Sequence, residues 1–282
     1  MERIQEAIEK AKRERSGRIG ASDGKPARAD AESSSAVAEV KKPESRATQP
    51  NESIRVQYSD TRRVEMTEPA MKEKRIVAGF SHDARSEPYR QLRGQILKKF
   101  RANNWQTLAV TSPTSGSGST LTSVNLAISL SMETNQTVML VDLNLREPGV
   151  ASIFGLEGVD KGIAEHVTDN YPLEKILVNP GFERLVLVPA VARSGFTSEI
   201  LSSPEMSVVM QEIIDRYPQR IIIFDLPAVL DHDDALVFAP KCDATLMVLA
   251  EGASSTSDIE RTYQLLEGCN ILGSVLNKVR YT

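Results

Sequence analysis

The run from Ser112 to Thr120 contains the residue types that bind an anion. It reads Ser-Pro-Thr-Ser-Gly-Ser-Gly-Ser-Thr and leads into helical periodicity over 119–134. A small, glycine-rich loop of this kind directs its backbone N–H groups to one point, and the dipole of the following helix favours negative charge there. The candidate phosphate-binding residues are Gly116, Ser117, Gly118, Ser119 and Thr120.

One position in this run departs from the usual nucleotide-binding pattern. The phosphate-loop consensus ends in Gly-Lys-Ser/Thr, where the lysine reaches the β- and γ-phosphates and the hydroxyl binds Mg²⁺. Gly118 and Thr120 match that pattern, whereas Ser119 stands at the lysine position. Taken alone, the run is typical of a polar turn that caps a helix, so phosphate binding depends on the residues around it.

Two aspartates end apolar runs elsewhere in the chain. Asp142 lies in Val-Asp-Leu-Asn-Leu-Arg, and Asp225 lies in Phe-Asp-Leu-Pro. A carboxylate at the end of a buried strand is unfavourable unless something satisfies it. Two of them on strands flanking an anion-binding loop indicate a site for Mg²⁺ and water. The alternative is that each caps the next turn or helix. The three features together favour a nucleotide site, in which Asp142, Asp225 and Thr120 are the candidate catalytic and metal-binding residues.

Buried strands and helices must position these residues. Six continuous apolar runs are typical of strands covered on both faces, and five helical stretches lie between them. This alternation predicts an α/β fold, a doubly wound and mostly parallel sheet in a three-layer α/β/α arrangement. Ligands bind at the carboxyl ends of such strands. The predicted strands are 107–112, 137–144, 184–190, 220–227, 244–250 and 272–277, and the predicted helices are 86–103, 119–134, 204–216, 232–240 and 256–268.

Charged residues mark two of the predicted helices. Glu87, Arg90 and Arg93 recur every three residues and therefore lie near one face of the helix over 86–103. They form either a solvated charged stripe or a self-complementary interface between subunits. Asp231 precedes the helix over 232–240 and is predicted to cap it.

The composition changes near residue 76. Residues 1–75 contain no tryptophan or phenylalanine, but 17 basic and 14 acidic residues, and so cannot offset the entropy of ordering. We expect a disordered N-terminal extension with a flexible linker over 17–75, followed by a folded domain over 76–282. Residues 1–16 carry apolar residues at helical spacing, which predicts a short amphipathic helix that is either solvated or docked on a partner.

The whole-chain composition excludes several classes of protein. The 282 residues are 40% hydrophobic, enough for a sizeable core, and the net charge of −4 does not suit a nucleic-acid partner. Cys242 and Cys269 show neither a disulfide framework nor zinc-ligand spacing. No apolar run is long enough to span a bilayer, and the N-terminus lacks the apolar core of a secretory signal. We therefore expect a cytoplasmic protein that reaches the membrane only through a partner.

The stretch from about 86 to 279 resembles the bacterial tyrosine autokinases of exopolysaccharide and capsule biosynthesis. These kinases are a branch of the P-loop NTPase superfamily that includes the MinD and ParA ATPases. The resemblance lies in the phosphate loop, an Asp-x-Asp-x-Arg strand end, a hydrophobic-Asp-x-Pro strand end and the closing LLEGCNILGSVLNKVR. The helix with Glu87, Arg90 and Arg93 matches the family's Glu-x-x-Arg-x-x-Arg oligomerisation signature. The first residues and the linker also resemble the subgroup encoded with exosortase-linked polysaccharide loci.

The resemblance implies ATP and Mg²⁺ as cofactors, bound between the subunits of a ring-like oligomer. It also implies a membrane polysaccharide co-polymerase as activating partner, and hence a location at the inner face of the plasma membrane. Asp142 matches the family's catalytic or water-orienting aspartate, and Asp225 matches the aspartate on the Mg²⁺ side. Arg146 matches the arginine of the second-strand motif, and Asn277 matches a position that lines the adenine pocket.

The departures from the family concern its chemistry. Ser119 replaces the phosphate-loop lysine, Asn144 replaces the second aspartate, and Ser115 and Ala228 replace prolines. Tyr281 stands alone where the family has a cluster of phosphorylated tyrosines. Because phosphoryl transfer depends on positioning and on stabilising charge, these changes predict weakened ATP and Mg²⁺ binding and weak or absent activity. In that case Asp142 and Asp225 would be vestigial.

Three hypotheses about function follow. The first is a catalytically degraded regulatory or assembly component of exopolysaccharide biosynthesis or export, acting as a homo-oligomer or as a hetero-oligomer with an active paralogue. The second is an active ATP-dependent tyrosine autokinase that controls polysaccharide chain length or export, with Arg146 or Lys278 replacing the lysine. The third is a MinD- or ParA-like positioning ATPase, against which the Glu-x-x-Arg-x-x-Arg helix argues.

Overall fold

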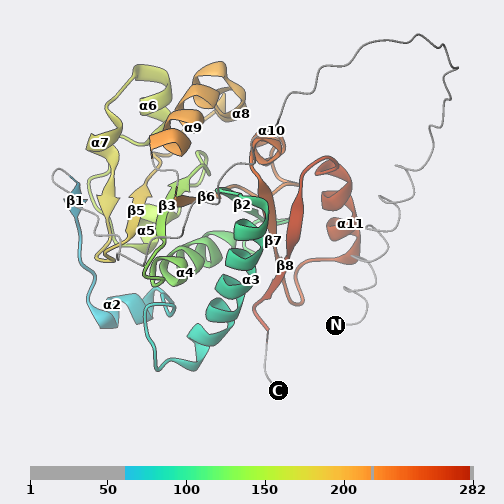
Figure 1. Ribbon diagram of the computed structural model, residues 1–282. Helices are drawn as coiled ribbons and strands as arrows, with labels where there is room; N and C mark the ends of the chain where they lie inside the picture. The colour runs from blue at the N-terminus through green and yellow to red at the C-terminus, as the bar shows by residue number, and fades with distance from the viewer. Residues whose placement is uncertain (1–60, 217–218, 280–282) are drawn as a thin grey trace, which may run out of the picture. The chain divides into compact units, whose positions relative to one another are not determined.

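The computed structural model describes residues 61–216 and 219–279 (Figure 1). In these ranges eight strands form one sheet with the order β1-β4-β5-β3-β6-β2-β7-β8. Neighbouring strands run parallel, except β4 and β5, which pair antiparallel. The strands are β1 (Arg62–Arg63), β2 (Thr107–Thr111), β3 (Thr137–Asp142), β4 (Val178–Asn179), β5 (Leu185–Val188), β6 (Arg220–Asp225), β7 (Ala244–Ala250) and β8 (Ile271–Asn277).

Helices cover both faces of this sheet. Every residue of β2, β3, β6 and β7 is buried, which requires packing on both sides. One pair of contacting helices, α3 and α4, lies side by side (Figure 1), and α6, α8, α9 and α10 form a second contacting group. The helices are α2 (Glu68–Glu73), α3 (Glu87–Asn103), α4 (Ser119–Ser131), α5 (Val150–Ile153), α6 (Ile163–Asp169), α7 (Leu173–Ile176), α8 (Thr197–Ser202), α9 (Pro204–Arg216), α10 (Asp234–Phe238) and α11 (Thr256–Leu265).

The predicted α/β fold with a mostly parallel, doubly wound sheet is confirmed. All six predicted strands and all five predicted helices are present. The sequence did not predict the short elements β1, β4, α2 and α5–α8, because segments of two to seven residues are too short to show a period.

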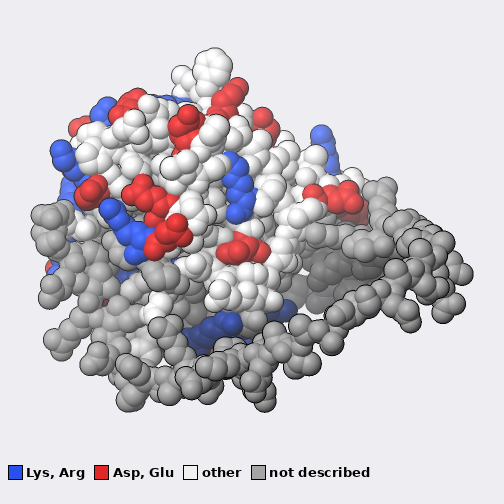
Figure 2. All heavy atoms as spheres, turned by 45° about the horizontal axis from the view of Figure 1, so that its top comes forward, with Lys and Arg blue, Asp and Glu red and all other residues white. Residues whose placement is uncertain are grey.

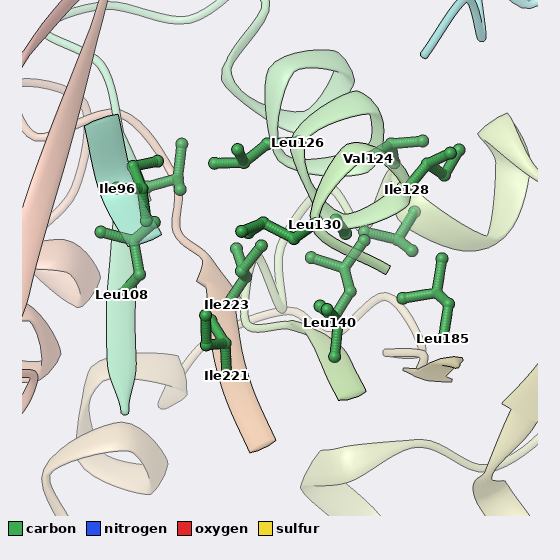
Figure 3. Packing of buried hydrophobic residues seen from close by; sticks show 14 of the residues in the cluster. Ile96, Leu108, Val124, Leu126, Ile128, Leu130, Leu140, Leu185, Ile221 and Ile223 are labelled. Carbon is green, nitrogen blue, oxygen red and sulfur yellow. The ribbon is translucent and has the colours of Figure 1, made fainter. Parts of the chain in front are cut away.

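The central helix α4 organises the core and carries the phosphate-binding candidates at its start. Every residue from Thr122 to Ser131 is buried, because α4 packs against both the sheet and α3. Figure 3 shows Leu130 of α4 beside Ile223 of β6 and Leu140 of β3. Burial of each such side chain contributes about 1.5–3 kcal/mol, so the position of the α4 N-terminus is fixed by the core.

The folded unit begins earlier than the predicted boundary at residue 76. Residues 61–75, expected to belong to the flexible linker, contain β1, which pairs with β4, and α2, which Thr67 caps. Met66 and Met71 pack against the core. The buried side chain of Asn125 on α4 accepts the N–H groups of Val77 and Ala78 at 2.8 and 3.0 Å. These few contacts order a segment whose composition resembles a linker.

Several sequence predictions concern other parts of the chain. The amphipathic helix over 1–16, the linker over 17–60 and Tyr281 lie outside the described residues. None of the helices between residues 61 and 279 that the structure describes is long and apolar enough to cross a membrane.

Candidate functional site

The two aspartates lie side by side at the carboxyl edge of the sheet. Asp142 ends β3 and Asp225 ends β6, and they are register partners across the two strands. β6 is in turn the neighbour of β2, which leads into the phosphate-loop run. The expectation that the two strands flank the loop is wrong, since the order β3-β6-β2 places both aspartates on one side of it. Strand order of this kind is set by tertiary packing rather than by local pattern.

The loop between β2 and α4 has the shape of an anion cradle. Gly116 and Gly118 have positive φ values of 73° and 88°, which residues other than glycine rarely adopt. Ser117 Oγ donates to the carbonyl of Thr114 at 2.8 Å, which closes the turn. α4 begins at Ser119, so Ser119 and Thr120 occupy its first turn, at the positive end of the helix dipole.

Asn277 contacts this loop from the end of β8. Its Nδ2 donates to the carbonyl of Ser117 at 2.9 Å, and its Oδ1 accepts the N–H of Lys278 at 2.9 Å. A Cβ atom added to Gly118 would overlap Asn277 Nδ2. The amide of Asn277 therefore supports the loop, which is a role that its sequence position did not suggest.

Asp142 is fully buried and accepts three backbone hydrogen bonds. Its Oδ1 binds the N–H of Asn144 at 3.1 Å, and its Oδ2 binds the N–H groups of Gly149 and Val150, each at 3.0 Å. It thus caps the turn after β3 and the start of α5, as the alternative reading of the sequence proposed. Burial and the charge of Asp225 raise the pKa of Asp142 to about 8, against the effect of the three N–H groups.

Asp225 is equally buried but less well satisfied. Ser123 Oγ donates to its Oδ1 at 2.8 Å, whereas Oδ2 has no hydrogen-bond partner among the described residues. Burial raises its pKa to about 6, while the hydroxyls of Thr120 and Ser123 act in the opposite direction. A buried carboxylate oxygen beside a hydroxyl is a ligand type that Mg²⁺ accepts, so Thr120 and Asp225 fit the predicted metal position. Among the described residues no three His, Cys, Asp or Glu side chains form a metal cluster.

Two other charged residues, Arg146 and Asp231, lie near this edge of the sheet. Arg146 Nε donates to Asp234 Oδ2 at 3.0 Å, and the buried Asp234 also accepts the hydroxyl of Thr197 at 2.8 Å. Asp231 does not cap α10, whose N-cap is Asp233.

No family model matches the chain. The tyrosine-protein kinase CpsD of Streptococcus pneumoniae serotype 4 is 30% identical over 191 residues, which cover 67% of this chain and 79% of the relative. The chain belongs to the bacterial tyrosine kinase family. The resemblance drawn from the sequence motifs is thereby confirmed.

Solved structures agree with this family in fold. The kinase domain of the Escherichia coli tyrosine kinase ETK superposes with a TM-score of 0.68 at 24% identity, covering 78% of this chain and 89% of that one. The cell division ATPase MinD of Pyrococcus furiosus gives a TM-score of 0.51 at 21% identity, covering 61% and 71%. At these identities the likeness shows the fold alone, which is the P-loop NTPase fold predicted from the sequence.

The Glu-x-x-Arg-x-x-Arg motif lies on α3, apart from the loop. Glu87 and Arg90 form an ion pair at 2.7 Å, and Arg90 also donates to the carbonyl of Ser81 at 3.2 Å. Arg93 donates to the carbonyl of Ser129 at 3.0 Å and pairs with Glu133 at 3.2 Å. Arg93 thus braces α3 against the end of α4, whereas Glu87 pairs with Arg90 on α3 and stays half-exposed.

The surface toward the upper edge of Figure 1 carries both signs of charge. Figure 2 shows Lys and Arg side chains interspersed with Asp and Glu on this face, without a large area of one sign. Such a mixed surface does not suit steering of a polyanion such as a nucleic acid.

Proposed function

We propose that this tyrosine kinase family member is a regulatory or assembly component of exopolysaccharide biosynthesis or export in which phosphoryl transfer is weak or lost. The observation that carries the proposal is Ser119, which places a short neutral side chain where the family's lysine would contact the transferred phosphoryl group. The candidate replacement Arg146 is held by Asp234 at 3.0 Å.

The charges around the loop support this proposal. Asp225 and Asp231 lie at or beside it, and without a lysine they leave the site acidic, whereas the raised pKa of Asp142 keeps that carboxyl mostly uncharged at neutral pH. Phosphoryl transfer is stabilised by positive charge placed where negative charge develops. Losing such a cation costs several kcal/mol of transition-state stabilisation, or about 10²- to 10⁴-fold in rate.

The cradle itself is kept, so we propose weak binding of ATP and Mg²⁺ rather than none. Gly116, Gly118 and the start of α4 would hold phosphate oxygens through backbone N–H groups, and Thr120 with Asp225 would hold the metal ion. A bound Mg²⁺ would neutralise part of the phosphate charge. Asn277 would keep the loop in shape during binding.

The proposed partners are a membrane polysaccharide co-polymerase and further copies of this chain or of an active paralogue. Glu87, Arg90 and Arg93 would make the contact between copies, because a neighbouring subunit can exchange the Glu87–Arg90 pair for an equivalent pair across the interface. The protein would then work in the cytoplasm at the inner face of the plasma membrane, held there by the co-polymerase.

An active tyrosine autokinase is the second candidate. Membership of the family favours it, as do the retained Thr120, Asp142 and Asp225. In that case Lys278, which follows β8 and is exposed, or Arg146 would supply the missing charge. A positioning ATPase of the MinD type rests on fold likeness alone.

Autophosphorylation and calorimetric titration with ATP and Mg²⁺ test the proposal on the full chain. Three proteins are compared: the natural chain, Ser119→Lys, and Ser119→Gln as a control of similar length without charge. We expect no tyrosine phosphorylation in the natural chain and at least a tenfold rise in ATP affinity for Ser119→Lys only, since one restored charge contact is worth about 1.4 kcal/mol or more.

Robust ATP-dependent tyrosine phosphorylation of the natural chain would overturn the proposal. The active-kinase alternative predicts that Ser119→Lys changes the rate little and that Asp142→Ala abolishes it. Similar gains in Ser119→Lys and Ser119→Gln would show that side-chain length, rather than charge, limits binding.

A further inference from the structure

A carboxylate of this chain already contacts the phosphate loop. The N–H of Ser115 donates to Asp231 Oδ2 at 3.1 Å, and the hydroxyl of Ser115 donates to the same oxygen. Ser115 comes directly before Gly116, at the point where the cradle opens to solvent. Asp231 therefore places a negative oxygen at the open end of the loop, next to Gly116.

The backbone after β6 holds Asp231 in this position. The N–H groups of Val229 and Leu230 donate to the carbonyls of Ser112 and Pro113 at 2.9 and 3.0 Å. The segment from Ala228 to Asp231 thus follows the loop residue by residue and brings the Asp231 carboxylate opposite Ser115. This pairing holds the Asp231 backbone opposite Ser115, and the exposed carboxylate reaches the loop from there.

The Asp231 carboxylate repels an anion bound in the loop. Two unit charges about 4 Å apart repel enough to change an affinity by about fivefold even in bulk water. Both Asp231 and Ser115 are exposed, so the carboxylate can leave the loop without exposing any core residue. Its withdrawal needs only rotation of the side chain.

We infer that Asp231 is an internal competitor for anions at the phosphate loop, which an incoming nucleotide must displace. The inference rests on the proposed phosphate-binding role of the loop and adds to it a second reason, independent of Ser119, for weak binding. On this inference, Asp231 raises the nucleotide concentration that is needed to occupy the loop. When no anion is bound, its contact with Ser115 holds the loop in a defined shape.

Calorimetric titration of the full chain with ATP and Mg²⁺, and separately with inorganic phosphate, tests this inference. Asp231→Asn keeps an oxygen acceptor for Ser115 but removes the charge, and Asp231→Ala removes both. Asp233→Asn is the matched control, because it makes the same charge change on an exposed residue two positions away whose side chain does not cap α10. Each variant is also made with Ser119→Lys, so that affinities are compared in a stronger-binding background.

We expect both Asp231 variants to bind about tenfold more tightly than their parent, with Asp231→Ala at least equal to Asp231→Asn. Asp233→Asn should change affinity by less than about twofold, and raising the salt from low to high concentration should shrink the gain of Asp231→Asn, because exposed charges are screened.

Three results would overturn the inference. If Asp231→Asn and Asp233→Asn changed the anion affinity equally, the cause would be the general charge of the protein. If Asp231→Ala bound the anion more weakly than its parent, Asp231 would support the loop for binding instead of competing with the anion. No binding by any variant, including those with Ser119→Lys, would mean that the loop is no anion site, so that the proposed nucleotide binding fails as well. If the natural chain bound ATP tightly and showed kinase activity, only the proposed function would be refuted. The ratio of the ATP affinities of the Asp231 and Asp233 variants would still decide this inference.

Discussion

Replacing Asp225 with asparagine should stabilise the ligand-free protein at neutral pH. Asp225 Oδ1 accepts the Ser123 hydroxyl, and Oδ2 has no hydrogen-bond partner among the described residues, so asparagine keeps the useful acceptor and removes the buried charge. The pKa of Asp225 is raised from 3.8 to about 6 mainly by burial, which means that the folded protein tolerates the ionised form poorly.

The size of the effect follows from this shift. About two pKa units at about 1.36 kcal/mol each give a ceiling of about 3 kcal/mol in the free energy of unfolding. The new Nδ2 atom also needs a partner, which reduces the gain, so we expect about 1–3 kcal/mol at pH 7.5.

The sign depends on pH. Because the folded pKa of Asp225 lies above the unfolded value, the folded protein binds the proton more tightly than the unfolded chain does. The stability of the natural chain is therefore greatest below the unfolded pKa near 4, falls as the pH rises, and becomes level above about 6 for this group. Asp225→Asn lacks this decline, so the two proteins should differ little at pH 4 and most at pH 7.5.

Urea unfolding followed by circular dichroism, in the presence of a chelator, measures this difference at both pH values. Asp160→Asn is the control, since Asp160 is exposed and the substitution makes the same charge change. Two results would refute the claim that Asp225 carries an uncompensated buried charge. One is an Asp225→Asn variant that is less stable than the natural chain at pH 7.5, and the other is the same change in the free energy of unfolding at both pH values.

Four further substitutions test how the site is held. Asn125→Ala should lower the free energy of unfolding by about 2–4 kcal/mol in urea, because it leaves two N–H groups before α3 without their acceptor. Gly118→Ala should destabilise by about 2 kcal/mol in thermal unfolding, since it combines a positive φ with overlap at Asn277. Gly116→Ala, where a Cβ meets nothing within 4 Å, should cost about half as much. Asp234→Asn should weaken the ion pair with Arg146 and lower the free energy of unfolding in urea by about 1–3 kcal/mol. An unchanged free energy of unfolding would argue against that pair.

The elements that position the site could be predicted because their signals are local. The strands that end at Asp142 and Asp225 are continuous apolar runs, and the glycines at 116 and 118 adopt the positive φ values that the loop requires. The relation between these elements could not be predicted. That both aspartates lie on one side of β2 depends on strand order, which no local pattern encodes.

Two residues show why the remaining features were missed. Asn125 is a polar residue inside a buried helix, and only its contacts with Val77 and Ala78 show that it orders the segment before α3. Asp231 looked like a helix cap because aspartate before a helix is common there. Its contact with Ser115 arises from backbone pairing between two loops distant in sequence, and backbone pairing leaves no trace in side-chain type.

The contrast between the two aspartates bears on what the site still binds. Asp142 is satisfied by three backbone N–H groups, so it can remain as a structural cap whatever the site does. One buried oxygen of Asp225 accepts no hydrogen bond from the residues that the structure describes, and a structural role alone would not offset that cost. A divalent cation would offset it, and we therefore expect MgCl₂ to raise the stability of the natural chain by about 1.4 kcal/mol at about ten times its Kd, and not that of Asp225→Asn. If unfolding at matched ionic strength shows no such gain, the acidic site has lost cation binding together with its lysine, and Asp225 is a remnant that weakens the fold.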